Sequence, residues 1–208
     1  MSIAIVALTG NYAVVATDSK MVGDRAGELC HKLQVIKNDM VIFGTGNAGL
    51  VKAFIDTIAK DKERYQNYSF EDMLAVMDSF DEWIRKDYAH VNIFCAIGVC
   101  DGSKYHVRVV ESSPDYPPNP FIVEGKTSDE KLHFYILPPA DLSPDFCNAL
   151  FRQNCRGISR PSSLHTLVSP CLKTIRMVSH ISKSVGEPID YWAYDRHTGE
   201  CEVQFFDS

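Results

Sequence analysis

The chain has 208 residues, of which 45% are hydrophobic and 23% are charged, and its formal net charge is −6 at pH 7. A chain of this length and apolar content can bury a sizeable core, and we expect residues 1–208 to form one domain. The negative charge and the lack of a Lys/Arg cluster argue against nucleic acid or an anionic membrane as a partner. With no long apolar run and no signal-type segment, we expect a cytoplasmic protein with no membrane contact.

Seven cysteines are scattered along the sequence without a C-x-x-C pair. This usage predicts reduced thiols in a reducing compartment, most of them buried as small apolar side chains. Cys30 and His31 are the only adjacent Cys and His. Neighbours on a strand point to opposite faces, so these two residues cannot easily share a metal ion. We therefore expect neither a metal nor a cofactor.

Three β-strands are predicted at the start of the chain, from segments rich in apolar and β-branched residues. They cover residues 2–8, 11–20 and 30–36. Residues 9–11, Thr-Gly-Asn, form a hairpin signal between the first two. We expect the second and third strands to be antiparallel neighbours of the first. That arrangement would bring Asp18 and Lys32 toward Ser2.

Ser2 is a candidate nucleophile because it directly follows Met1. Its small side chain behind Met1 favours removal of the methionine, which would leave a serine with a free α-amino group. A serine hydroxyl is a weak nucleophile until a base takes its proton, and an α-amine with a pKa of about 7.7 to 8.0 can do so near neutral pH. A fixed cation and a carboxylate would support this pair, and Lys32 and Asp18 are the candidates.

The remaining predicted elements alternate between helices and strands. Apolar residues at helical spacing mark a helix over residues 50–64, and Ser69 opens a second helix as an N-cap followed by an acidic first turn. Later helices open at Ser143 and cover residues 164–181. The further predicted strands cover residues 91–99, 105–110, 121–124, 132–137, 189–194 and 201–206. This order fits a four-layer αββα sandwich, an α+β fold of two face-to-face antiparallel sheets with helices outside both.

The N-terminal motifs resemble the proteasome β-subunit and HslV branch of the N-terminal nucleophile hydrolases. The resemblance rests on a hydroxyl residue behind Met1, the hairpin ending Ala-Thr-Asp-Ser-Lys, and the segments Cys-His-Lys-Leu-Gln-Val-Ile and Phe-Gly-Thr-Gly-Asn-Ala-Gly. It implies that Ser2 is the nucleophile, with its own amine as base, and that Asp18 and Lys32 support it. It also implies that the glycine turn at Gly46 supplies an oxyanion donor, and that the protein forms a homo-oligomer.

The second half departs from the family pattern. Active members have a Gly-Ser-Gly type turn before the third helix, and an Asp with a Ser-Gly pair after the fourth. We match these to residues 123–128 and 182–186, where hydroxyl residues occur but no aspartate. The candidates for tuning the amine are Thr127, Ser128, Ser182 and Ser184.

Two functions stay open at this stage. The first is a peptide or small-amide hydrolase that works through an acyl-enzyme on Ser2. The alternative is a catalytically silent subunit of the same fold, with a structural or binding role in a larger ring. Cys30 is a second candidate nucleophile, although no base is positioned for it by the sequence.

Overall fold

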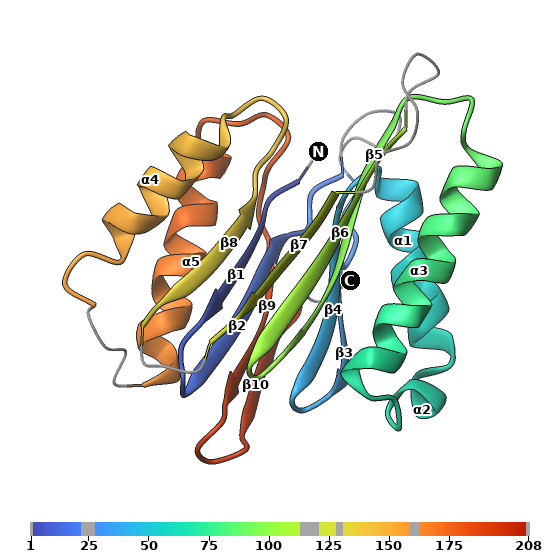
Figure 1. The fold of residues 1–208 in the computed structure, drawn as a ribbon. Coiled ribbons are helices and arrows are strands. Elements are labelled where there is room, and N and C mark those ends of the chain that lie inside the picture. Colours follow the sequence, from blue (N-terminus) through green and yellow to red (C-terminus); the bar gives the residue numbers. More distant parts are fainter. Residues whose placement is uncertain (1, 22–27, 113–120, 128–130, 159–162, 207–208) are drawn as a thin grey trace.

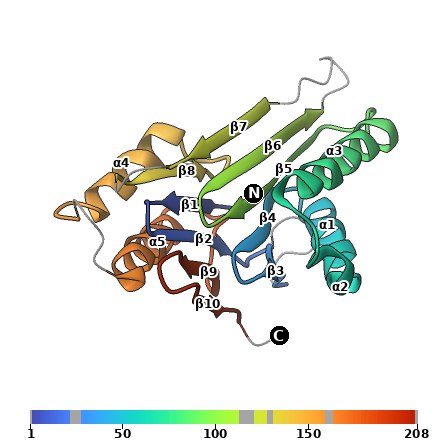
Figure 2. The same cartoon turned by 60° about the horizontal axis from the view of Figure 1, so that its bottom comes forward.

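A computed structural model describes residues 2–21, 28–112, 121–127, 131–158 and 163–206. Two five-stranded antiparallel sheets lie face to face, and helices cover the outer face of each, as Figure 1 and Figure 2 show from two directions. The expected four-layer αββα sandwich is confirmed. In the described part of the chain, no helix is long and apolar enough to span a membrane.

The first sheet has the strand order β10-β9-β2-β1-β8. Its strands are β1 (Ala4–Leu8), β2 (Tyr12–Asp18), β8 (His133–Leu137), β9 (Ile189–Asp195) and β10 (Cys201–Gln204). All five residues of β1 are buried, because β2 and β8 flank it and other layers cover both of its faces. A continuous apolar run is the pattern that such a doubly buried strand requires.

The second sheet has the order β3-β4-β5-β6-β7. Its strands are β3 (Leu33–Lys37), β4 (Met40–Gly46), β5 (Ile93–Asp101), β6 (Lys104–Ser112) and β7 (Phe121–Lys126). Each strand pairs with its neighbour in sequence, so the sheet is a simple meander. Two-residue turns join β3 to β4 and β5 to β6, whereas α1, α2 and α3 lie in the connection from β4 to β5.

Helices α1 (Ala48–Lys60), α2 (Lys62–Tyr65) and α3 (Phe70–Asp87) cover the second sheet. Helices α4 (Pro144–Asn154) and α5 (Leu164–Ser179) cover the first. The predicted N-cap at Ser69 is confirmed, and with Asp72 it forms a capping box. Ser143 caps α4 with Pro144 in the first turn. The predicted helix over residues 50–64 is broken at Asp61, the C-cap of α1 and the N-cap of α2.

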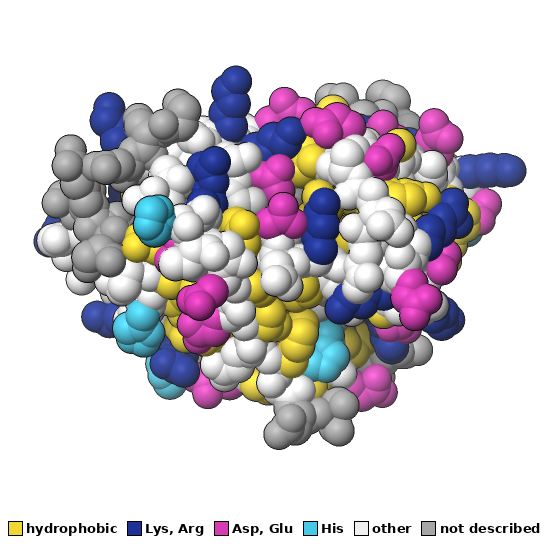
Figure 3. Space-filling view, turned by 90° about the horizontal axis from the view of Figure 1, so that it is seen from below, with side chains coloured by type: hydrophobic (Ala, Val, Ile, Leu, Met, Phe, Trp, Pro, Cys, Tyr) yellow, Lys and Arg dark blue, Asp and Glu magenta, His cyan; other side chains and the backbone are white. Residues whose placement is uncertain are grey.

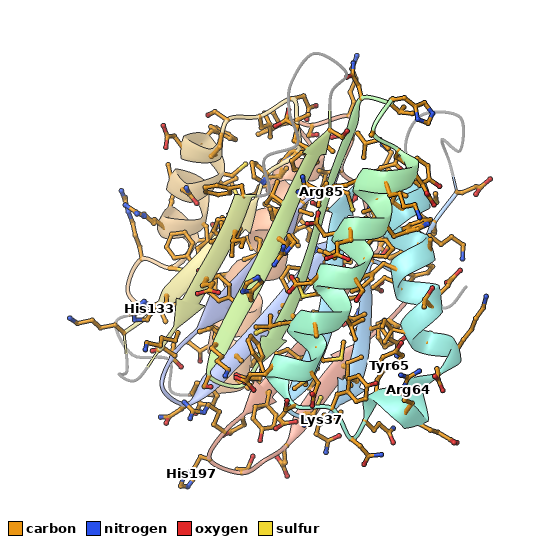
Figure 4. All side chains as sticks on the ribbon, turned by 45° about the vertical axis from the view of Figure 1, so that its right-hand side comes forward. Lys37, Arg64, Tyr65, Arg85, His133 and His197 are labelled. Carbon is orange, nitrogen blue, oxygen red and sulfur yellow. The ribbon has the colours of Figure 1, made fainter. Side chains whose placement is uncertain are left out.

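Polar contacts tie the helical layer to the second sheet. Figure 4 shows Lys37, Arg64 and Tyr65 at the end of this layer where α2 lies, and Lys37 Nζ donates to the Tyr68 carbonyl at 3.2 Å. Arg85, higher on α3 in the same view, donates from Nε to both carboxylate oxygens of Asp81 in the same helix, at 3.0 and 3.1 Å. Arg108 of β6 also donates to Asp81 Oδ2, at 3.4 Å, and this contact joins α3 to the sheet. Figure 3 shows Lys and Arg interspersed with Asp and Glu on the face seen from below. That face therefore offers no field of one sign to a polyanion.

The two sheets share a core of alternating side chains. Ala4, Val6 and Leu8 of β1 pack with Val41 and Phe43 of β4 in this inter-sheet layer. The intervening residues Ile3, Ile5 and Ala7 point the other way, into the core beneath α4 and α5. This period of two settles the direction of each β1 side chain.

One predicted pairing is wrong. The third predicted strand does not lie beside the first, because β3 is the edge strand of the other sheet, and β8 takes the second place beside β1. Lys32 lies just before β3, so its side chain extends from the second sheet across to Asp18 in the first sheet.

Candidate active site

A buried ion pair joins the two sheets near the start of β1. Asp18 ends β2, Lys32 precedes β3, and Lys32 Nζ lies 3.2 Å from Asp18 Oδ2. Their side chains are only 2% and 0% exposed, for Lys32 and Asp18 respectively. Each charge loses its hydration, so the pair persists only because each partner neutralises the other and further polar groups complete their hydrogen bonds.

Those further groups come from three segments of the chain. Lys32 Nζ donates to the Lys20 carbonyl at 2.7 Å. Asp18 Oδ1 accepts from the Ile3 amide at 3.0 Å, and Asp18 Oδ2 accepts from the Gly186 amide at 3.4 Å. The carboxylate is thus held against the backbone of Ile3, the residue that follows Ser2.

Ser2 is itself only 5% exposed. Because Ile3 faces α5 and Ala4 faces the second sheet, the alternation places Ser2 on the inter-sheet side. The Asp18 amide also donates to the Ile3 carbonyl at 3.3 Å, which fixes the backbone beside Ser2 in both directions. Met1 lies outside the described residues, so its removal stays a prediction.

Burial and charge act in opposite directions on Asp18. Burial raises the pKa of Asp18 above its ordinary value, while the charge of Lys32 and the amides of Ile3 and Gly186 lower it. Burial is the largest of these effects. The carboxylate therefore depends on Lys32 to stay ionised, and loss of that cation would favour the neutral acid.

Gly46 ends β4 in a conformation that favours glycine. Its φ is +105°, and a Cβ atom built there would lie 2.5 Å from the Phe94 carbonyl oxygen. Asn47 follows as the N-cap of α1, with its side chain accepting from the Leu50 amide. The sequence signal at this turn thus corresponds to a tight strand-to-helix junction, and the N-terminus of a helix such as α1 favours an anionic group.

The second-half candidates fall in different places. Ser182 Oγ donates to Asp141 Oδ1 at 2.7 Å, and Ser184 Oγ donates to the same oxygen at 3.2 Å. Thr127 lies away from this cluster, because its amide donates to Ser103 at the β5–β6 turn, the opposite end of the sheet from Gly46. Ser128 is outside the described residues.

Asp141 is the residue that sequence reasoning missed. The segment before the third long helix is 138–142, so the match of that turn to residues 123–128 is wrong, whereas residues 182–186 do follow the fourth long helix, α5. The expected aspartate is absent from residues 182–186, but Asp141 supplies a carboxylate to them from the start of α4. The hydrogen bond from the Ser182 hydroxyl is the largest of the effects that lower the pKa of Asp141. No spacing rule links residues 41 positions apart, so only the fold could reveal the contact.

This Asp141 cluster reaches the ion pair through the backbone of the 182–186 segment. The Lys183 carbonyl accepts from Lys20 Nζ at 2.9 Å, and Gly186 donates to Asp18. Asp141, Ser182 and Ser184 therefore fix the 182–186 loop, and this loop donates a hydrogen bond to Asp18 through Gly186.

Cys30 and His31 have different surroundings. Burial raises the pKa of the Cys30 thiol, so little of it is thiolate at neutral pH. His31 Nδ1 lies 3.0 Å from Asp190 Oδ2, and its ring stacks on Phe206 at 4.2 Å between centroids. His31 is thus engaged with Asp190. The expectation that Cys30 and His31 point to opposite faces of a strand is wrong, because β3 begins only at Leu33 and both residues precede it. Both residues line a cavity of about 410 Å³ between β3, α1 and the 205–206 segment, which we term the β3–α1 cavity.

Solved structures with the same architecture are proteasome-like. Anbu from Hyphomicrobium sp. strain MC1 (a Gly-1 mutant) superposes with a TM-score of 0.66 at 16% identity, covering 99% of this chain and 85% of that chain. The helical assembly of the Anbu complex from Pseudomonas aeruginosa gives 0.67 at 14% identity, covering 99% and 88%. HslV from Trypanosoma brucei gives 0.56 at 15% identity, covering 93% and 99%.

At these identities the likeness concerns the fold alone. The fold is that of the proteasome-like N-terminal nucleophile hydrolases, as the N-terminal motifs predict. No family model matches the sequence, and no curated protein matches it.

Proposed function

We propose that this chain is an amide hydrolase that uses Ser2 as its nucleophile, acting on peptides or small amides. The observation that carries the proposal is the buried Lys32–Asp18 pair, hydrogen-bonded to the backbone of Ile3 directly after Ser2. Burying a lysine and an aspartate costs folding stability through desolvation. Their position beside a hydroxyl residue therefore supports a functional role for the pair.

The proposed reaction begins once Met1 has been removed. The α-amine of Ser2 takes the hydroxyl proton, and Oγ attacks the carbonyl carbon of the amide. Lys32 keeps the amine in its neutral, basic form by like-charge repulsion, and Asp18 fixes Lys32 in place. The backbone amide at Gly46 stabilises the oxyanion of the tetrahedral intermediate.

The second half of the reaction reverses the proton transfer. The leaving nitrogen receives the proton from the α-amine and departs, which leaves an ester on Ser2. Water, deprotonated by the same amine, then hydrolyses this ester. Apart from the substrate and water, every group in this scheme belongs to the chain itself.

Covalent labelling tests the proposal. A β-lactone probe should acylate Ser2, and Ser2→Ala should abolish labelling while circular dichroism stays unchanged. Ser2→Thr is the matched control, because it keeps the hydroxyl and the amine and should retain labelling. A fold that is intact but never labelled would favour the silent subunit instead.

We also propose that the chain associates with copies of itself. The support is that one structural neighbour is described as a helical assembly. Size-exclusion chromatography with light scattering tests this, and a mass of about 23.3 kDa at micromolar concentration would contradict it.

A further inference from the structure

A second cavity opens between the two sheets at their β7 and β8 edges. It has a volume of about 360 Å³, and we term it the inter-sheet cavity. Aromatic and aliphatic groups line it, contributed by β5, β6, β7, β8 and the segment after β8: Phe94, Val109, Phe121, Tyr135, Leu137 and Leu142. Among the described residues that line it, only Glu111 is charged. An apolar cavity of this size suits a small organic group, since ligand sites commonly measure about 300–1,000 Å³.

One wall of this cavity runs beside Ser2. Leu137 pairs with Ala4, and the two strands are antiparallel. The chain beyond Leu137 therefore passes the N-terminal end of β1, and Pro138, Pro139 and Ala140 in this stretch all line the cavity. Asp141 follows them and is fixed by its hydrogen bonds to Ser182 and Ser184.

The opposite wall touches the Gly46 turn. A Cβ atom on Gly46 would lie 2.9 Å from Phe94 Cδ1, so the Phe94 ring packs directly against the glycine. The Phe94 carbonyl accepts from the Asn47 amide at 2.7 Å, which holds this residue to the turn. The inter-sheet cavity thus borders both the nucleophile's strand and the proposed oxyanion donor.

The two cavities lie on opposite sides of Ser2. In the first sheet, β2 flanks β1 on one side and β8 flanks it on the other. Asp18 lies on the β2 side with Lys32, whose neighbours Cys30, His31 and Leu33 line the β3–α1 cavity. The inter-sheet cavity lies on the β8 side. A substrate bound with its carbonyl group at Ser2 would therefore extend toward the β3–α1 cavity on one side of the amide bond and toward the inter-sheet cavity on the other.

We infer that the inter-sheet cavity binds the apolar side chain of the residue whose amine departs when the amide is cut. This assignment rests on the proposed function. The α-amine of Ser2 must deliver a proton to the leaving nitrogen, so that nitrogen has to lie at the N-terminal end of β1. The 138–140 segment of the cavity wall passes this end. Glu111 at the cavity disfavours an acidic side chain there by like-charge repulsion.

The step that uses this cavity is balanced within the site. Ser2 Oγ forms a bond to the carbonyl carbon, and the carbon–nitrogen bond of the amide breaks. The hydroxyl proton passes through the α-amine to the nitrogen, which leaves as a neutral amine. The reverse step is aminolysis, in which a free amine held in the cavity attacks the Ser2 ester, returns a proton to Oγ and forms a new amide.

Aminolysis provides the test, because the rate at which an added amine captures the acyl-enzyme depends on how well that amine binds at the leaving-amine position. Ser2 is acylated with an activated peptide ester, and the acyl-enzyme is divided between water and leucinamide, glycinamide or glutamic acid α-amide. Leucinamide should be captured at least about tenfold better than glycinamide, since a single methylene group in an apolar pocket is worth about tenfold or more. The acidic amide should be the poorest acceptor.

Three phenylalanine variants sharpen the test. Phe121 is 62% exposed, so Phe121→Ala should fold normally while losing most of the preference for leucinamide. Phe94→Ala should lose the preference as well. Phe146→Ala is the matched control, since Phe146 is 41% exposed on α4 and lies outside the cavity.

Saturation-transfer NMR with leucinamide gives a reading that needs no turnover. Transfer to the leucine methyl groups should appear with the wild type and weaken with Phe121→Ala. Labelled Ser2 without a leucinamide preference, or with a preference that both variants retain, would overturn the cavity assignment and leave the proposed function standing. If saturation transfer to leucinamide depends on Phe121 but Ser2 is never labelled, the result would support amine binding in the inter-sheet cavity and would overturn the proposed hydrolase function. Absence of both signals would overturn both.

Discussion

Lys32 and Asp18 meet at 3.2 Å between the two sheets, and the backbone beside them is joined as well, because the Cys30 amide donates to the Ser19 carbonyl at 3.0 Å. The pair connects β3 of the second sheet to β2 of the first and, through the Ile3 amide, to the residue after Ser2. A change to either partner should therefore alter both the stability of the sandwich and the geometry at Ser2.

The first prediction separates these two effects. Lys32→Met leaves Asp18 buried without its cation and should lower the free energy of unfolding by about 3–5 kcal/mol. Adding Asp18→Asn removes the stranded charge and should recover much of that loss. Urea unfolding measures both, and β-lactone labelling should stay absent in the double variant. A double variant no more stable than Lys32→Met would contradict the account of the pair.

Gly46 gives the second prediction, with a control in the same chain. Gly46→Ala places a Cβ 2.5 Å from the Phe94 carbonyl oxygen at a φ of +105°. The strained backbone alone should cost about 1–3 kcal/mol, and the clash should add to it and displace the turn. Gly199→Ala also has a positive φ, at +76°, but meets nothing within 4 Å.

Thermal unfolding and the rate of probe labelling are the measurements for this pair. Gly199→Ala should show only the cost of the strained backbone and normal labelling, whereas Gly46→Ala should show a larger loss of stability and slow labelling. Equal effects of the two substitutions would mean that the close approach to Phe94 has no consequence.

How much the sequence could predict is clearest where the signals are local. The starts of two helices can be predicted from capping residues, because the cap and the first turn of the helix lie within four residues of each other. These signals are Ser69 with Asp72 for α3 and Ser143 with Pro144 for α4. Which sheet a strand joins is not a local property. Nearness in sequence predicts that the segment containing Lys32 lies beside β1, but β8, more than a hundred residues later, takes that position.

The candidate site divides in the same way. Ser2, Asp18, Lys32 and Gly46 lie in a short stretch with a recognisable spacing, so they could be named in advance. The contact of Asp141 with Ser182 and Ser184 joins the start of α4 to the loop after α5, and it forms only when the two helices pack. A missing aspartate in the 182–186 stretch therefore did not mean a missing carboxylate in the structure.

Asp141 gives the third prediction, on pH. Its pKa is lowered from 3.8, chiefly by the Ser182 hydroxyl, so the folded state holds the ionised form. The sign follows: the stabilisation is present above 3.8 and is lost as the pH falls through the lowered value. Asp141→Asn should remove this dependence and should speed hydrogen exchange at residues 182–186 at neutral pH. Exchange that matches the wild type would contradict the role of Asp141 in holding that loop.

The fourth prediction concerns the base. If the α-amine of Ser2 takes the proton, the rate should rise with pH and level off at or below about 8, since nearby Lys32 disfavours the protonated amine. Histidine should play no part. His31 and His106 are engaged with Asp190 and Glu124, and His133 pairs with Leu8 at the far end of β1, as Figure 4 shows for its position on β8.

The measurement is the pH profile of hydrolysis of a short peptide amide, repeated for single substitutions of the seven histidines. The rising limb should survive each one. A limb that disappears with one His→Gln change, or a rate that requires added metal, would identify another base.

Mass spectrometry of the labelled protein bears most directly on Ser2 as an N-terminal nucleophile. After reaction with a β-lactone, the intact mass should show one added acyl group on protein that has lost Met1, and peptide mapping should place that group on Ser2. The account predicts no adduct on Ser2→Ala. An adduct on Cys30, or on Ser2 in protein that retains Met1, would contradict it.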